Sequence, residues 1–223
     1  MFFPDNIKSI GPKDRVLEVG PGATPHPRSN VFLELAYHSL EEKLLQRGGG
    51  VDEGHFGERP VIQYDGGIFP FGDGEFNYVI CSHVIEHVND PAAFMREVFR
   101  VGNGRGYLEY PLITYEYMYG FAVHQHFLKF DHSSRVLQFL PKTATDFHQF
   151  APIQSFFYAS LEKGWDDICA ANKQLFFEGF EFNHAFDIEQ TQKIEALCPA
   201  PTALAAKGSA RKLIGRVFNK LGI

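Results

Sequence analysis

The segment VLEVGPGATPHP at residues 16–27, an apolar run that ends abruptly in glycine and proline, most constrains the fold. Its first four residues predict a buried strand. Gly20 and Gly22 then allow a tight turn and a close approach to a ligand, and we expect a side chain at either position to stand where a ligand lies. With Glu18 inside the strand and Glu34 near the end of the next apolar run, the pattern indicates the nucleoside-binding edge of an open α/β sheet.

Length, charge and cysteine content exclude several classes of protein. The chain has 223 residues, 44% of them hydrophobic, which fits one well-packed domain with a tail. A formal charge of -6 argues against general nucleic-acid binding, which requires a basic face. The three cysteines have no metal-like or paired spacing, and no segment approaches eighteen uninterrupted apolar residues. We therefore expect a cytoplasmic protein that does not span a membrane.

Apolar runs bounded by turn residues predict five strands in the first half of the chain, at residues 15–19, 31–35, 61–64, 78–82 and 106–110. Helices are expected at residues 38–47 and from Pro91 onward, where Asp90 serves as the N-cap. Only eleven residues separate the first two strands, which is short for a parallel crossover. The alternation of strands and helices nevertheless predicts a doubly wound, mostly parallel sheet.

The second half gives weaker signals. Residues 112–150 are rich in tyrosine, histidine and phenylalanine, with a helix expected at residues 134–140. Residues 154–173 are expected to be helical. Residues 174–188 suggest two apolar strands around Gly179, which form an antiparallel hairpin at the sheet edge.

Three segments together resemble the class I methyltransferases that use S-adenosylmethionine. VLEVGPG at residues 16–22 matches the glycine-rich first motif of that family. Residues 65–91 match the region from the third strand to the helix after the fourth, and residues 99–111 match the fifth-strand region. The resemblance spans residues 14–111 and implies a three-layer, Rossmann-like fold. It also implies S-adenosylmethionine as cofactor and S-adenosylhomocysteine as product.

By position, the resemblance implies a cofactor site of eight residues: Glu18, Gly20, Gly22, Glu34, Asp65, Gly66, Ser82 and His83. The glycines would approach the methionine and ribose portions of the cofactor, and Glu18 would support their loop. Glu34 would accept hydrogen bonds from the ribose hydroxyls, and Asp65 would lie beside the adenine amine. The two residues after the fourth strand would border the reacting methyl group.

Histidines are the candidates for removing a proton from the methyl acceptor, because histidine titrates near neutral pH. The candidates are His83, His124 and His126; the alternation of the last two predicts that both project to one side. With Asp131 and His132 they have no established ligand spacing, so no metal site is predicted.

Other residues of this region have more ordinary expectations. His87 precedes a helix and is expected to be a structural hydrogen bonder. Tyr115, Tyr117 and Tyr119 are expected either to line a substrate pocket or simply to cover the sheet.

The domain organisation follows from these assignments. One domain covers residues 1–198, with a cofactor-binding half at residues 14–111 and a substrate-side half at residues 112–198. Residues 199–223 form a basic tail whose helical pattern is amphipathic. It would contact an anionic membrane surface or a protein partner, pack against its own domain, or fray.

The sequence therefore predicts methyl transfer from S-adenosylmethionine to a small-molecule or glycan-like acceptor. Two alternatives remain open. One is a non-catalytic methyltransferase-like scaffold, and the other is an NAD-dependent oxidoreductase. The second is disfavoured because Pro25 stands where the third glycine of the dinucleotide pattern belongs.

Overall fold

The five strands predicted for the first half are all present. The computed structural model describes residues 1–46 and 55–199. The first-half elements are β1 (Val16–Val19), β2 (Val31–Leu35), α1 (Leu40–Gln46), β3 (Val61–Tyr64), β4 (Tyr78–Ser82), α2 (Pro91–Val101) and β5 (Gly106–Pro111). The second-half elements are α3 (Ile113–Tyr119), β6 (His126–Asp131), β7 (Val136–Pro141), α4 (Ala151–Ser160), α5 (Trp165–Ala171), β8 (Phe177–Phe182) and β9 (Asp187–Gln190).

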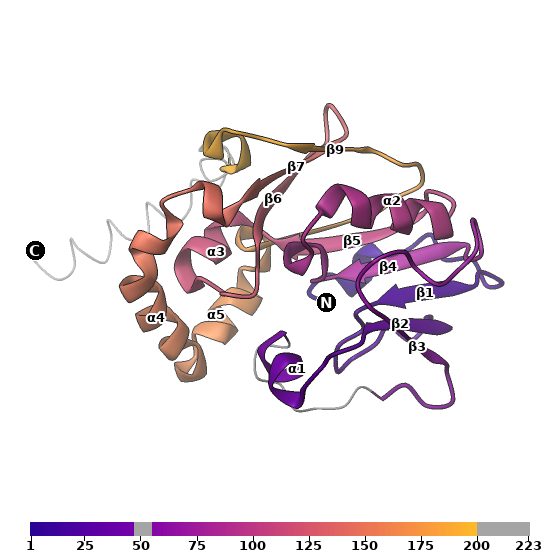
Figure 1. The fold of residues 1–223 in the computed structure, drawn as a ribbon. Coiled ribbons are helices and arrows are strands. Elements are labelled where there is room, and N and C mark those ends of the chain that lie inside the picture. Colours follow the sequence, from indigo (N-terminus) through magenta and orange to yellow (C-terminus); the bar gives the residue numbers. More distant parts are fainter. Residues whose placement is uncertain (47–54, 200–223) are drawn as a thin grey trace, which may run out of the picture.

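The main sheet has six strands in the order β3-β2-β1-β4-β5-β8 (Figure 1). β1 to β5 are mutually parallel and β8 is antiparallel to β5. β1 and β2 pair in parallel although the eleven residues between them contain no helix. The mostly parallel, Rossmann-like sheet with an antiparallel edge is therefore confirmed.

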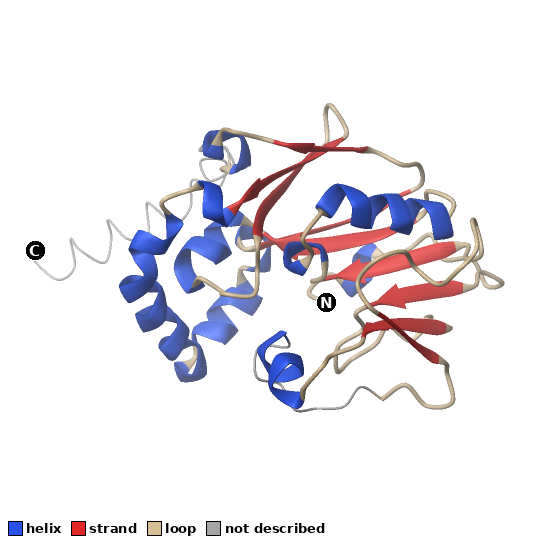
Figure 2. Ribbon diagram, in the orientation of Figure 1, coloured by secondary structure: helices blue, strands red, loops and turns tan. Residues whose placement is uncertain are grey.

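Two different layers cover the faces of this sheet. Figure 2 shows α2 and the smaller three-stranded sheet β6-β7-β9 on one side. Met95 and Val98 of α2 pack there with Val79 of β4 in the largest cluster of buried apolar side chains. On the opposite face, the N-terminal segment packs Ile7 and Ile10 against the sheet. The predicted cap of α2 is also present, because the Asp90 side chain accepts a hydrogen bond from the backbone N–H of Ala93.

The expected helix at residues 134–140 is wrong, because this segment enters strand β7. Leu137 and Phe139, two residues apart, are buried in the apolar core, whereas Val136 and Gln138 are partly exposed, a spacing of two that is typical of a strand. The turn before β7 is held by Asp131, whose carboxylate accepts hydrogen bonds from the hydroxyl groups of Ser133 and Ser134. Those bonds stabilise the turn of the β6–β7 hairpin. Pairing with β6 then makes residues 136–141 a strand and not a helix.

The expected hairpin around Gly179 is also replaced by another arrangement. Gly179 lies in the middle of the single strand β8, opposite Glu109 of β5. A Cβ atom at Gly179 would lie 2.2 Å from the Tyr107 hydroxyl oxygen, so the glycine serves close packing and not a turn. The next strand, β9, leaves the main sheet and pairs in parallel with β7.

Helices α3, α4 and α5 gather beyond one end of the main sheet (Figure 1). The helical expectation for residues 154–173 agrees with α4 and α5. Within residues 1–46 and 55–199, no helix is long and apolar enough to cross a membrane. The expected amphipathic helix of the tail lies outside the described residues, which end at residue 199.

Candidate active site

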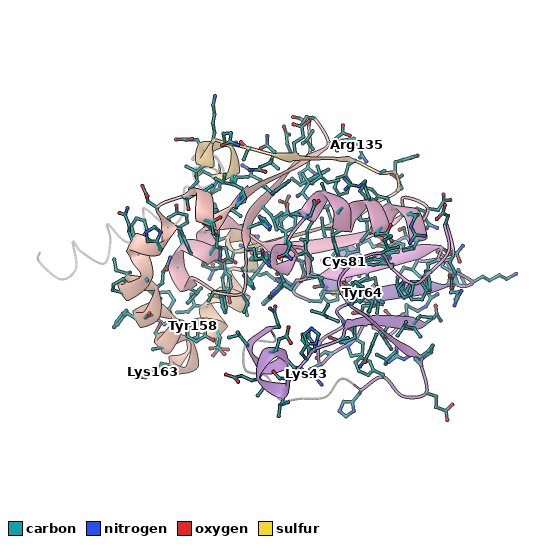
Figure 3. The ribbon with its side chains drawn as sticks, in the orientation of Figure 1. Lys43, Tyr64, Cys81, Arg135, Tyr158 and Lys163 are labelled. Atoms are coloured by element: carbon teal, nitrogen blue, oxygen red, sulfur yellow. The ribbon has the colours of Figure 1, made fainter. Side chains whose placement is uncertain are left out.

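A cavity of about 1080 Å³ opens at the carboxyl ends of the parallel strands. This is the edge at which open α/β sheets bind ligands. All eight residues predicted for the cofactor line it: Glu18, Gly20, Gly22, Glu34, Asp65, Gly66, Ser82 and His83. Figure 3 shows Tyr64 and Cys81 in the main sheet, Lys43 on α1 below them, and Tyr158 on α4 to the left. The cavity is large enough for a nucleoside-sized ligand and a second molecule.

The two glycines of the first loop have different reasons to be glycine. Both adopt left-handed conformations, with φ of 59° at Gly20 and 61° at Gly22. A Cβ at Gly20 would lie 2.6 Å from Cγ2 of Val84, whereas a Cβ at Gly22 would meet no atom within 4 Å. Both glycines line the cavity, but only at Gly22 is the space that a side chain would enter free of protein atoms. At Gly20 the obstacle is Val84.

Glu18 holds this loop from beneath. Its buried carboxylate accepts hydrogen bonds from the Ser29 hydroxyl at 2.6 Å and from the His26 backbone N–H at 2.8 Å. Burial raises the pKa of Glu18, although both hydrogen bonds oppose the shift. A buried carboxylate thus ties the end of the loop to β1.

Glu34 and Asp65 contribute acidic side chains to one wall of the cavity. Glu34 lies in β2 and pairs in register with Gln63 of β3, and Asp65 follows directly after β3. Because β2 and β3 are parallel neighbours, their carboxyl ends bring the two carboxylates to the same side of the cavity. Such a wall suits a ligand that presents hydroxyl and amine donors.

His83 is clamped between two buried carboxylates. Its Nε2 lies 3.0 Å from Glu109 Oε1 and its Nδ1 lies 3.2 Å from Glu86 Oε1. Burial disfavours the imidazolium, but these hydrogen bonds outweigh it and raise the pKa of His83 to about 9. Both ring nitrogens therefore carry a proton at neutral pH. Without a lone pair, His83 is unsuited to the general-base role considered for it.

Glu109 links the end of β4 to the N-terminal segment. Its fully buried carboxylate accepts hydrogen bonds from the backbone N–H groups of Phe2 and Phe3, at 2.6 and 3.0 Å. It also accepts one from the Ser82 hydroxyl at 3.0 Å. Although burial raises its pKa, the hydrogen bond to His83 lowers the pKa of Glu109 to about 2. The arrangement fixes Ser82 and His83 at the cavity.

His124 and His126 do not project to the same side. His124 lies before β6 in an irregular segment and lines the cavity, where its Nδ1 is 2.5 Å from Glu116 Oε1. His126 belongs to β6, is 5% exposed, and directs Nε2 to the Val88 carbonyl oxygen at 3.0 Å. His126 is not among the cavity-lining residues. Strand alternation failed because the strand begins only at His126.

His87 occupies a more important position than the sequence indicates. It lines the cavity and packs against His124 with ring centroids 4.6 Å apart. Its Nδ1 lies 3.0 Å from the Gln46 side-chain oxygen, so the expected structural hydrogen bond is present. Burial lowers the pKa of His87 to about 4, against the opposing charge of Glu86, and the ring is neutral at pH 7.

The four residues considered for a metal do not form a common site. Asp131 binds its own turn, and His132 Nε2 lies 2.8 Å from Glu178 Oε1 at the surface. His126 faces Val88, while His124 faces the cavity.

Aromatic side chains form another part of the cavity lining. Tyr115 and Phe121 lie nearly parallel with ring centroids 5.3 Å apart, and Phe2 stacks on Phe177 at 3.9 Å. All four line the cavity. Phe2 and Phe177 each also meet the His83 ring edge-on at 5.4 Å. These contacts bring the N-terminal segment and the start of β8 to the carboxyl end of β4.

Only one of the three tyrosines expected in the pocket lines the cavity. Tyr115 does so. Tyr117 stacks on Phe127 at 5.5 Å, and the Tyr119 hydroxyl lies 3.1 Å from the Cys169 sulfur. The alternative expectation was that these aromatics cover the sheet, and Tyr117 does pack against Phe127 of β6, whereas Tyr119 contacts Cys169 of α5.

Comparison with known proteins finds similarity to methyltransferases within the first half of the chain. Residues 32–109 match the family model of a methyltransferase domain. The search of curated protein sequences gave no match. An S-adenosylmethionine-dependent methyltransferase from Thermotoga maritima aligns at 22% identity over 49% of each chain, with a TM-score of 0.31. One from Mesorhizobium loti aligns at 15% identity over 56% of each chain, with a TM-score of 0.34. The chain thus spans about half the length of these proteins.

Proposed function

We propose that this chain, which carries a methyltransferase domain of the class I, S-adenosylmethionine-dependent family, transfers a methyl group to a small-molecule or glycan-like acceptor. One observation carries the proposal. A single cavity joins the eight strand-end residues to a lining of aromatic rings and histidines. The first set suits the cofactor, and the second suits an acceptor that presents a flat or sugar-like face.

The residues at the strand ends fit the cofactor. Gly22 leaves open space beside the first loop, and Glu34 and Asp65 offer carboxylate acceptors for ribose hydroxyls and an adenine amine. S-adenosylmethionine supplies a methyl group activated on a sulfonium sulfur, and S-adenosylhomocysteine is released. The chain's own residues bind and orient the two molecules, because an in-line displacement gains most from positioning.

The acceptor end is assigned to His124, His87 and Tyr115. His124 is the predicted catalytic histidine that lines the cavity with a ring nitrogen not already directed to a carboxylate. Its Nδ1–H donates to Glu116, which orients the ring. An O–H or N–H group of the acceptor would therefore lose its proton at this end of the cavity.

Two further assignments accompany this proposal. Residues 1–198 form one domain, since the halves 14–111 and 112–198 both contribute side chains to the cavity. A cytoplasmic location accords with the free thiols of Cys81, Cys169 and Cys198.

Calorimetric titration with S-adenosylhomocysteine tests the proposal. We expect micromolar binding, and none of NAD under the same conditions. Glu34→Gln should weaken binding about tenfold to a hundredfold, because it removes charge-assisted hydrogen bonds to the ligand. Glu58→Gln, at an exposed residue, is the matched control and should bind normally. Absence of S-adenosylhomocysteine binding would refute the function, and unchanged affinity in Glu34→Gln would refute the role of that residue alone.

A further inference from the structure

Three side chains with metal-binding atoms converge at the acceptor end of the cavity. They are Glu86 and His87, in the turn after β4, and His124, which lies in the segment before β6. A carboxylate oxygen and one ring nitrogen from each histidine lie within 4.8 Å of one another. Two imidazoles and one carboxylate form a donor set that binds divalent transition metals and leaves coordination positions open.

A second observation is that one carboxylate oxygen of this cluster lacks a hydrogen-bond partner among the described residues. Glu86 is fully buried, and its Oε1 faces His83. Its other oxygen, Oε2, has no hydrogen-bond partner among the described residues. An unpaired carboxylate oxygen away from water destabilises the folded protein, so such an atom is expected to have a cation or a donor beside it.

The outer contacts of the two histidines direct their other nitrogens toward a metal. His87 Nδ1 faces the side-chain oxygen of Gln46, and His124 Nδ1 faces the carboxylate of Glu116. Both partners only accept hydrogen bonds, so each Nδ1 carries the proton and each Nε2 keeps its lone pair. Glu116 is in turn held by Lys142. Metal-binding histidines are oriented in this way by carboxylates and carbonyl oxygens.

The charges around the cluster leave Glu86 Oε2 without a direct counterion. Glu86 Oε1 faces His83, which it shares with Glu109, and the N-terminal ammonium of Met1 lies 3.9 Å from Glu109 Oε1. Lys142 binds Glu116 on the outer side of His124. Among the described residues, these cations therefore contact other carboxylate oxygens, and Glu86 Oε2 stays available for a metal ion.

We propose that Glu86, His87 and His124 bind a divalent transition metal ion, with Zn²⁺ as the best-matched species, and hold it with open positions toward the acceptor. Nitrogen donors favour Zn²⁺ over Mg²⁺ and Ca²⁺, which prefer all-oxygen sites. The site deepens the proposed function, on which its catalytic role rests. His87 and His124 both line the cavity, so a hydroxyl oxygen of an acceptor can reach the ion from there.

The chemistry assigns the acceptor to molecules with a hydroxyl group. Coordination lowers the pKa of a bound hydroxyl, as it does for bound water. Because His124 Nε2 binds the ion in this arrangement, the hydroxyl proton passes to solvent and not to that histidine, and an oxygen lone pair forms the new C–O bond. The S–C bond breaks at the same time and its electron pair stays on sulfur.

The test loads metal-stripped, untagged protein with Co²⁺ and with Zn²⁺, in parallel with the S-adenosylhomocysteine titration. Co²⁺ should give a visible d–d absorption at one equivalent, which Zn²⁺ abolishes by displacement. Glu86→Gln, His87→Gln and His124→Gln should each weaken metal binding at least tenfold, while Glu116→Gln weakens it roughly tenfold to a hundredfold through the outer contact. His184→Gln, at an exposed histidine, is the control and should bind normally.

Circular dichroism of each variant separates lost binding from lost folding. No stoichiometric binding by the wild-type protein, or binding that is unchanged in all three ligand variants, overturns the metal site. Binding of S-adenosylhomocysteine without metal would then leave the methyltransferase proposal intact. Metal binding without S-adenosylhomocysteine binding would instead refute the function and retain the site.

Discussion

At the scale of single residues, Gly20 and Gly22 look equivalent in the sequence, but the structure disfavours a side chain at the two positions for different reasons. Gly20 is limited by Val84 and Gly22 by its backbone alone. Both substitutions should lower the free energy of unfolding by about 1–3 kcal/mol for the left-handed backbone, and Gly20→Ala should lower it further because of the clash with Val84. Urea denaturation measures both.

Val84→Ala supplies the control for this prediction, because it removes the methyl group that a Cβ at Gly20 would strike. The double variant should recover part of the stability that Gly20→Ala loses. No recovery would mean that backbone strain accounts for the whole effect. For Gly22→Ala, the loss should be confined to strain, and a weaker affinity for S-adenosylhomocysteine should accompany it.

The positions of single residues could be predicted where a general rule of sheet architecture applies. They could not be predicted where they depend on contacts between separate segments. The rule that ligands bind at the carboxyl ends of parallel strands placed Glu34 and Asp65 correctly at one cavity. No local signal indicates that His83 has φ of 57° and meets two carboxylates from different segments. Glu86 and Glu116 were missed although their histidine partners lie only three and eight residues away, because no local signal shows that the chain turns to bring them together.

At the scale of elements, the loop after β3 is held on α2 by hydrogen bonds to both members of an ion pair within that helix. Glu97 accepts a hydrogen bond from the Phe69 backbone N–H at 2.8 Å and pairs with Arg100 Nη2 at 2.5 Å. Arg100 also donates to the carbonyl oxygens of Phe69 and Phe71. The hydrogen bonds of Glu97 and Arg100 thus hold the segment that follows Asp65 in place, and with it one side of the cavity.

Glu97→Gln should lower the free energy of unfolding at pH 7 by about 1 kcal/mol, a modest value because the pair is partly exposed to solvent. The hydrogen bond to Arg100 lowers the pKa of Glu97 below its unfolded value. A lowered carboxyl pKa contributes stability above the unfolded pKa, near 4.3, and that contribution is lost as the pH falls.

The difference between wild type and Glu97→Gln in urea denaturation should therefore shrink between pH 7 and pH 3. Glu189→Gln, at an exposed residue of β9, controls for a general charge effect and should show no such trend. A difference that stays constant with pH would contradict the ionic role of Glu97.

The helices and strands that were predicted correctly are those whose conformation depends on nearby residues, and those that were mispredicted depend on residues distant in the sequence. α2 was predictable because its start signals, Asp90 and Pro91, lie within the helix end itself. β7 was mistaken for a helix because its conformation depends on pairing with β6 and on burial of Leu137 and Phe139. Gly179 suggested a turn because the Tyr107 hydroxyl that excludes a Cβ is 72 residues away in the chain.

At the scale of the whole molecule, the cavity depends on segments from all parts of the described chain. The strand ends of the first half meet Tyr115 and Phe121 from the middle of the chain, Phe177 of β8, and Phe2 near the N-terminus. Sequence motifs predicted the cavity residues of the first half, whereas those of the second half are recognised only from the structure. Binding in this cavity should therefore stabilise the protein as a unit.

A ligand that binds only the folded state stabilises it by about 2.7 kcal/mol at a hundredfold excess over its dissociation constant. For a domain of this size each kcal/mol raises Tm by about 2–4 °C, so S-adenosylhomocysteine should raise Tm by roughly 5–10 °C. Differential scanning calorimetry measures the shift. At the same ligand concentration, Glu34→Gln should show a smaller rise and Glu58→Gln the full one. A rise with NAD and none with S-adenosylhomocysteine would assign the cavity to a different cofactor.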